Sequence, residues 1–99
     1  MYKLDGKLFD WDKRKNLANL EKHGISFKVA ATAFLDPEAV TIEDWRHSQD
    51  ENRFILIGYS KNYELLSVCH CLRFKDEIVR IISARTASES EQLIYKEGS

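Results

Sequence analysis

The sequence has little of what usually cross-links a chain or carries it out of the cell. It has two cysteines among 99 residues, too few for a disulfide-stabilised secreted scaffold. Cys69 and Cys71 lie two apart in a predicted strand, where a disulfide would need strained geometry, so we expect free thiols. No apolar run approaches the length of a membrane-spanning helix, and no basic segment followed by an apolar one marks a secretory signal. We therefore expect a cytoplasmic protein without membrane contact.

An excess of charge of one sign is also lacking, since the formal net charge is −1. Surfaces that bind phosphate are basic, and the net charge alone does not indicate such a surface. The distribution is more informative, because cations gather in the first predicted helices and in the strands. Acids gather between Asp36 and Glu51 and again near the C-terminus. The sequence is therefore compatible with a surface that has one basic side.

Several chemical motifs are absent as well. The chain has no phosphate-binding glycine loop, dinucleotide fingerprint, serine nucleophile elbow or metalloprotease helix motif. The run Cys69-His70-Cys71 contains residue types that bind metals, but neighbouring strand residues point to opposite faces. Their spacing also differs from that of zinc sites. We therefore expect neither a metal site nor a cofactor.

What is present is the pattern of one α+β domain over residues 1–99. With 43% hydrophobic residues, the chain can build one core. Most strands follow two helices, which favours a twisted antiparallel sheet with an N-terminal helical hairpin on one face and a C-terminal helix. The predicted strands are Leu8–Trp11, Ala39–Glu43, Arg53–Tyr59, Leu65–Phe74 and Ile78–Ala84. The predicted helices are Asp12–His23, Phe27–Leu35 and a last one that starts at the capping boxes Thr86–Glu89 and Ser88–Glu91 and runs to about Lys96.

The two N-terminal helices have clear boundary signals. Asp12 is a suitable N-cap, Gly24 can adopt the positive φ at which helices end, and Ser26 can cap the second helix. The opposite face of the sheet is then the natural place for a functional site, and the polar segment Asp44–Asn52 precedes the third strand. The apolar residues that we expect to cover the first face are Leu17, Leu20, Phe27, Ala30, Ala31 and Phe34.

The segment from Phe9 to Phe27, FDWDKRKNLANLEKHGISF, resembles the opening signature of the BrnT toxin family. Lys13 departs from the proline that the family often has after the Trp-Asp pair, and this affects the first helical turn and not the chemistry. The resemblance extends to about Glu91. The other segments that agree are AFLDP at Ala33–Pro37, His47-Ser48, Arg53-Phe54, IGYS at Ile57–Ser60 and RIISART at Arg80–Thr86.

This resemblance implies a ribonuclease toxin of a type II toxin–antitoxin system with a RelE-like fold. Such a toxin cleaves RNA, inhibits translation and growth, and is neutralised by a cognate antitoxin. The resemblance further implies an antitoxin of the ribbon-helix-helix type that binds operator DNA, so that this chain reaches DNA only through its partner. RNA carries its own nucleophile, the 2′-OH, and cleavage therefore needs a base, an acid and cations but no metal. The alternative is a non-catalytic module that docks its antitoxin and tunes operon repression.

Two arginines at strand ends are candidates for catalysis. Arg85 ends the strand RIISAR, whose strict alternation predicts every second side chain on one face, and its planar guanidinium suits a scissile phosphate. The alternative role of Arg85 is an ion pair with Glu89 or Glu91 at the start of the last helix. Arg73 ends the preceding strand and is either a second phosphate ligand or an exposed charge.

The other two catalytic candidates are Lys22 and His23, in the last turn of the first helix. Histidine is suited to proton transfer near neutral pH, and a lysine beside it can contact phosphate. The alternative is structural, because the negative end of a helix favours cations.

Three further residues are candidates for RNA binding. Arg53 opens a strand after the polar segment, Trp45 is placed to stack on an unpaired base, and His47 is either mobile surface or a proton carrier. His70 lies on the apolar stripe of the strand around it, which is typical of a core histidine.

Overall fold

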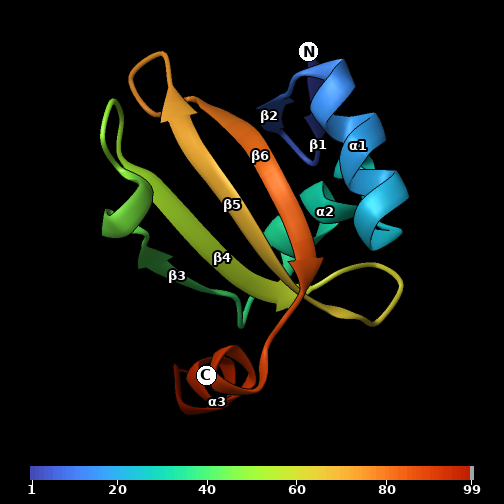
Figure 1. The fold of residues 1–99 in the computed structure, drawn as a ribbon, viewed down its shortest axis with the longest axis vertical. Helices are drawn as coiled ribbons and strands as arrows, with labels where there is room; N and C mark the ends of the chain where they lie inside the picture. Colours follow the sequence, from blue (N-terminus) through green and yellow to red (C-terminus); the bar gives the residue numbers. More distant parts are fainter. Residues whose placement is uncertain (99) are drawn as a thin grey trace.

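The chain forms a six-stranded sheet with the strand order β1-β2-β6-β5-β4-β3 (Figure 1). The computed structural model describes residues 1–98, so Ser99, the last residue of the predicted domain, lies outside the described part. The strands are β1 (Tyr2–Leu4), β2 (Lys7–Asp10), β3 (Val40–Glu43), β4 (Arg53–Tyr59), β5 (Leu65–Arg73) and β6 (Ile78–Thr86). The helices are α1 (Lys13–His23), α2 (Phe27–Thr32) and α3 (Glu89–Gly98), with the 3-10 turns η1 (Ala33–Leu35) and η2 (Trp45–His47).

The fold is α+β, as predicted, but the sheet is mixed, whereas the sequence predicted an antiparallel sheet. The strands β3 to β6 form the predicted antiparallel meander, but β2 pairs with β6 in parallel. A parallel pairing requires a long connection, which α1, α2 and the meander supply. β1 is an additional strand, joined to β2 by a tight turn at Asp5 and Gly6, whose φ angles are 50° and 80°. Three strand residues are too few to show an alternating pattern, so the sequence did not reveal it.

One face of the sheet builds the core with α2. Phe27, Ala30 and Ala31 of α2 are fully buried, as their spacing predicts, and Phe34 of η1 packs against the same cluster. The fully buried side chains include residues from β2, β5 and β6 on this face, so the hydrophobic core lies between α2 and the sheet. Those strand residues are Phe9, Leu66, Val68, Ile81 and Ala84.

The helix α1 does not pack as predicted, because its leucines point outward. Leu17 and Leu20 are 65% and 45% exposed, whereas Asn19 is buried. The reason is that β2 pairs with β6 only as far as Arg80, which leaves the edge of β6 open near Ala84. The Asn19 amide fills this gap, since its Nδ2 donates to the Ala84 carbonyl at 2.9 Å and its Oδ1 accepts from the Ala84 backbone N–H at 3.0 Å. The buried backbone groups of β6 need hydrogen-bond partners. The side of α1 that carries Asn19 therefore faces inward.

The helix α3 packs at one end of the other sheet face, at the end where β4 and β6 finish (Figure 1). Its start is the predicted capping box, in which Ser88 Oγ accepts from the Glu91 N–H at 3.2 Å and Glu91 Oε1 accepts from the Ser88 N–H at 2.9 Å. Near its other end, the Tyr95 hydroxyl donates to Asp36 at 2.8 Å. α3 covers only part of this face. Within residues 1–98, no helix is long and apolar enough to span a membrane.

Candidate functional site

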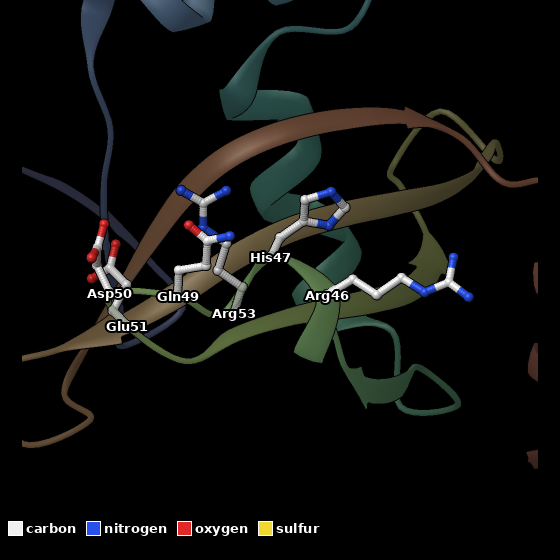
Figure 2. Close-up of a pocket in the computed structure, with 6 residues that line it drawn as sticks. All are labelled: Arg46, His47, Gln49, Asp50, Glu51 and Arg53. Carbon is white, nitrogen blue, oxygen red and sulfur yellow. The ribbon is translucent and has the colours of Figure 1, made fainter.

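The sheet face opposite the core contains an open hollow of about 400 Å³, lined by the segment before β4 and by strands β4, β5 and β6. A second hollow of about 240 Å³ adjoins it and shares Arg46, His47 and Arg53 (Figure 2). We call the two together the basic hollow. Its lining residues are Asp44, Arg46, His47, Gln49, Asp50, Glu51, Arg53, Ile55, Ser67, Cys69, Ile82, Ser83 and Arg85.

The floor of the basic hollow comes from the meander. Ile55 of β4, Cys69 of β5 and Ser83 of β6 lie directly opposite one another across the three strands, and the next row brings in Ser67 and Arg85. Neighbouring rows on one face follow from the alternation of side chains along each strand. Ser67, Cys69 and Ser83 have short side chains, and the hollow lies above this part of the sheet.

A bulge corrects the strict alternation predicted for RIISAR. The pairing shifts between Cys69 and His70, so that His70 lies opposite Ile81. Ile81 consequently faces the core, while Ile82 lines the hollow. An extra residue in one strand reverses the sides on which its neighbours point. Arg85 keeps its predicted place on the open face.

The histidine of the hollow, His47, is oriented by a carboxylate. Its Nδ1 contacts Asp44 Oδ1 and Oδ2 at 3.0 and 2.9 Å. The side chain of Asp44 is 14% exposed and that of His47 66%, so an inner carboxylate holds an accessible ring. Ser48 fixes the turn, because its Oγ donates to the Asp44 carbonyl at 2.7 Å and accepts from the Arg53 N–H at 2.9 Å. With Nδ1 occupied, Nε2 is the nitrogen available to a ligand.

The arginines around His47 differ in direction. In Figure 2 the side chains of His47 and Arg53 rise from the same side of the loop, whereas Arg46 extends away from both. The Arg46 guanidinium lies over the Trp45 ring, 5.7 Å from its centroid. Arg53, the first residue of β4, and His47 both line the two hollows.

Arg85 forms the ion pair that was its alternative role, and it lines the hollow as well. Its Nη1 and Nη2 donate to the two carboxylate oxygens of Glu91 at 2.7 and 3.0 Å. Ser67 Oγ donates to the same carboxylate at 3.0 Å. Burial alone would raise the pKa of Glu91, but hydrogen bonds from Arg85, the Ser88 backbone and Ser67 outweigh it and lower this pKa to about 2. The guanidinium is therefore held in one orientation by an ionised partner, with 44% of its side chain exposed.

The remaining candidates lie outside the hollow. Arg73 contacts Glu51 at 3.3 Å and does not line the basic hollow. Lys22 and His23 are exposed in the last turn of α1, and neither side chain forms a hydrogen bond or ion pair within residues 1–98. Trp45 is 74% exposed beside the hollow and not in it. The structure thus brings together Arg53, His47 and Arg85 and leaves the other four candidates apart.

The residues with metal-binding side chains do not gather. Among the described residues, no group of three or more His, Cys, Asp and Glu side chains could hold a metal ion. His70 is buried against Phe34, with ring centroids 4.9 Å apart, and burial lowers its pKa. It is a core histidine, as the apolar stripe of its strand indicates. Cys69 and Cys71 are both free thiols.

Sequence reasoning missed Asp44 and Arg46. Both lie in η2 or beside it, in a segment that was predicted only as a polar loop. The available signal was the spacing of Asp44 and His47, since residues three apart in a helical turn can meet.

Comparisons with known proteins agree with this architecture. The 1.1 Å crystal structure of the ribonuclease toxin BrnT from Brucella abortus is similar, with a TM-score of 0.63 and 22% sequence identity over 84% of this chain and 99% of that chain. No curated protein matches the chain. The model of the family described as the ribonuclease toxin BrnT of type II toxin–antitoxin systems matches residues 11–91. Because this match covers most of the sequence, the chain belongs to the BrnT family of ribonuclease toxins.

Proposed function

We propose that this chain is a metal-independent endoribonuclease and that it cleaves RNA at the basic hollow. One observation carries the proposal: a histidine oriented by a carboxylate, His47 on Asp44, shares one open hollow with Arg53 and Arg85. Cleavage through the 2′-OH of RNA needs a proton acceptor and fixed positive charge, and the hollow provides both.

The chemistry assigned to His47 is that of a general base. Asp44 accepts the Nδ1 proton, so Nε2 carries the lone pair that takes the proton of the 2′-OH. The 2′ oxygen then forms a bond to phosphorus, the bond to the 5′ oxygen breaks, and this oxygen takes a proton from water. The hydroxide that remains takes the proton held by His47, which restores the base. The products are a 2′,3′-cyclic phosphate and a 5′-hydroxyl. Asp44 also stabilises the imidazolium that forms, as a carboxylate does behind other catalytic histidines.

In this proposal, the arginines stabilise the negative charge that develops on the phosphate. Arg85 is the stronger candidate, because Glu91 and Ser67 hold its position before substrate arrives. Preorganised donors stabilise a transition state without reorganising during the reaction. Arg53 is the second candidate, since it lies on the same side of the loop as His47 (Figure 2). Trp45, beside the hollow, is placed to stack on a neighbouring base.

Lys22 and His23 form a competing candidate for proton transfer. They are accessible and adjacent in the last turn of α1, but the residues of the hollow do not include them. Arg73 is a less favoured phosphate ligand in this proposal, because it does not line the basic hollow. These roles are separable from that of His47 by single substitutions.

In the cell, we propose that RNA cleavage in the cytoplasm inhibits translation and growth until a cognate antitoxin neutralises the chain. A ribbon-helix-helix antitoxin would also contact operator DNA, so that repression involves this chain only through its partner. Membership of a type II toxin–antitoxin family supports this part of the proposal.

The test is cleavage of an end-labelled RNA by the purified full chain in the presence of EDTA. We expect fragments that end in a 2′,3′-cyclic phosphate, and growth arrest when the chain is expressed without antitoxin. A chain that binds antitoxin but cleaves no RNA, with or without divalent ions, would instead be a non-catalytic module. Cleavage that requires a divalent ion would overturn the metal-independent chemistry.

A further inference from the structure

The outward side of α1 has an apolar surface that the fold itself does not use. Leu17 is 65% exposed and Leu20 45%, although their spacing is that of a helix stripe made for burial. Beside them, Leu17 and Trp11 line a shallow hollow of about 780 Å³ between α1 and the first strands. We call this surface the α1 face. It consists of Met1, Tyr2, Trp11, Lys13, Leu17, Leu20 and Lys28.

The exposure of these leucines follows from how α1 is attached. Asn19 bonds to the edge of β6 at Ala84, and Asn16 Oδ1 accepts from the Phe27 N–H at 2.8 Å. Two asparagines thus attach the helix by directed hydrogen bonds, which fix its rotation. The leucines cannot turn inward without breaking these bonds. Exposed apolar groups that sit together on a fixed element mark an interaction site.

Cations outnumber acids around the α1 face, and Asp10, which lines its hollow, is already paired with Arg80 at 2.7 Å. The helix contains no acidic residue in its first turn and ends in Lys22 and His23, and Glu21 is its only acidic residue. None of the salt bridges among the described residues involves a lysine of this region. Its cations are Lys13, Arg14, Lys15, Lys22 and Lys28. These charges therefore remain available to an acidic partner.

We propose that the α1 face is the docking surface for an acidic segment of the antitoxin that carries large apolar side chains. The proposal rests on the toxin–antitoxin assignment above. Leucines at helix spacing suit apolar anchors on the partner, and the surrounding lysines suit carboxylates at the rim of the interface. No residue of the α1 face lines the basic hollow. Binding of the antitoxin at the α1 face can therefore be tested separately from RNA cleavage at the basic hollow.

Two other occupants fit the α1 face less well. In a twofold dimer the same patch faces itself, so a second copy would bring the lysines of both chains together. RNA would be attracted by the lysines, and single-stranded RNA is bound by stacking on aromatic rings. The rings of this face, Tyr2 and Trp11, are half-buried and pack against each other, with centroids 5.6 Å apart, whereas the exposed groups are leucines. An acidic, apolar protein segment satisfies both the charge and the leucines.

The test uses the full chain and its purified cognate antitoxin in titration calorimetry. Leu17→Glu/Leu20→Glu should weaken the affinity by about 100-fold or more, as for the central anchors of an interface. The matched control is Leu93→Glu on α3, a leucine that is 58% exposed elsewhere and that should leave the affinity within a few-fold. RNA cleavage by the free Leu17→Glu/Leu20→Glu chain should equal that of the wild type.

A second variant, Lys13→Glu/Lys28→Glu, keeps the test valid if the leucine variant does not fold. It should slow association and remove most of its salt dependence. Unchanged antitoxin affinity in either folded variant would overturn the proposal. A variant that loses RNA cleavage but keeps full antitoxin affinity would also overturn it, and would assign the face to RNA. A third contrary outcome is a wild-type dimer that the leucine variant converts to a monomer while antitoxin affinity stays the same, which would assign the face to a second copy of the chain. If the wild type cleaves no RNA but its antitoxin binding still depends on Leu17 and Leu20, the docking surface stands and the nuclease proposal fails.

Discussion

The basic hollow and the α1 face both carry positive charge, but they hold it differently. In the hollow, Arg85 is bound by Glu91 and His47 by Asp44, with contacts of 2.7 to 3.0 Å. On α1, the lysines have no such partners among the described residues, and they surround exposed leucines instead of a polar floor.

The difference separates two tasks in a chain whose net charge is only −1. Groups that must meet a reacting phosphate benefit from fixed positions, and carboxylate partners fix them in the hollow. Groups that attract a partner need accessibility more than a fixed position, because steering acts over a distance. The following predictions test whether the two regions are distinct in this way.

The largest effect should come from His47→Gln, which removes the base of the hollow. RNA cleavage at neutral pH should fall by about 10²- to 10⁴-fold, the usual contribution of a general base. The melting temperature should hardly change, because the side chain is 66% exposed. Single-turnover cleavage measures the effect. An active, folded His47→Gln chain would place the chemistry outside the hollow.

Arg85→Ala should reduce cleavage by about 10²- to 10³-fold, as expected for a lost transition-state donor. It should also lower the free energy of unfolding by about 1–3 kcal/mol, because Glu91 loses its charged partner. The double variant Arg85→Ala/Glu91→Gln separates the two effects. Its stability should recover in part while its cleavage stays low. Recovery of cleavage together with stability would make Arg85 a structural residue only.

The ion pair also predicts how stability depends on pH. The pKa of Glu91 is lowered to about 2 in the folded chain from 4.5, so its contribution is complete above pH 4.5 and is lost as pH falls toward 2. Each pKa unit corresponds to about 1.4 kcal/mol. Urea unfolding at a series of pH values should show a flatter acid dependence for Glu91→Gln. Parallel curves for both chains would mean that Glu91 does not stabilise the fold through its charge.

The smallest effect is expected for His23→Gln at the end of α1. Loss of the imidazole from the last helical turn should cost a few tenths to about 1 kcal/mol of stability. RNA cleavage should stay at the wild-type rate. If cleavage drops as far as in His47→Gln, the helix corner supplies the proton transfer and the two regions share one function.

Most of the fold followed from local patterns in the sequence. β4 has its predicted bounds, Asp12 and Ser26 cap their helices as expected, and Ser88 forms the expected capping box with Glu91. These features depend on neighbours within a few residues. The parallel pairing of β2 with β6 does not, because it joins segments 70 residues apart, such as Asp10 and Arg80.

The errors at α1 and β6 have the same origin. The leucine spacing in α1 is that of a core stripe, but the open backbone of β6 at Ala84 required Asn19 on the inner side. The bulge opposite Cys69 changed the side of Ile82. Neither the need for a polar partner nor a bulge is visible in the order of apolar residues. The sequence indicated His47, Arg53 and Arg85 as separate candidates and grouped Arg85 with Lys22, His23 and Arg73. The structure instead brings Arg85 together with His47 and Arg53, and the sequence analysis missed Asp44.

The pH dependence of RNA cleavage in EDTA, compared for the wild type and His47→Gln, tests the central claim most directly. The wild-type rate should fall on the acid side, because a protonated imidazole cannot accept the proton of the 2′-OH. The residual rate of His47→Gln should lack this acid limb. A variant that keeps the acid limb of the wild type, at a comparable rate, would contradict the assignment of the base to His47.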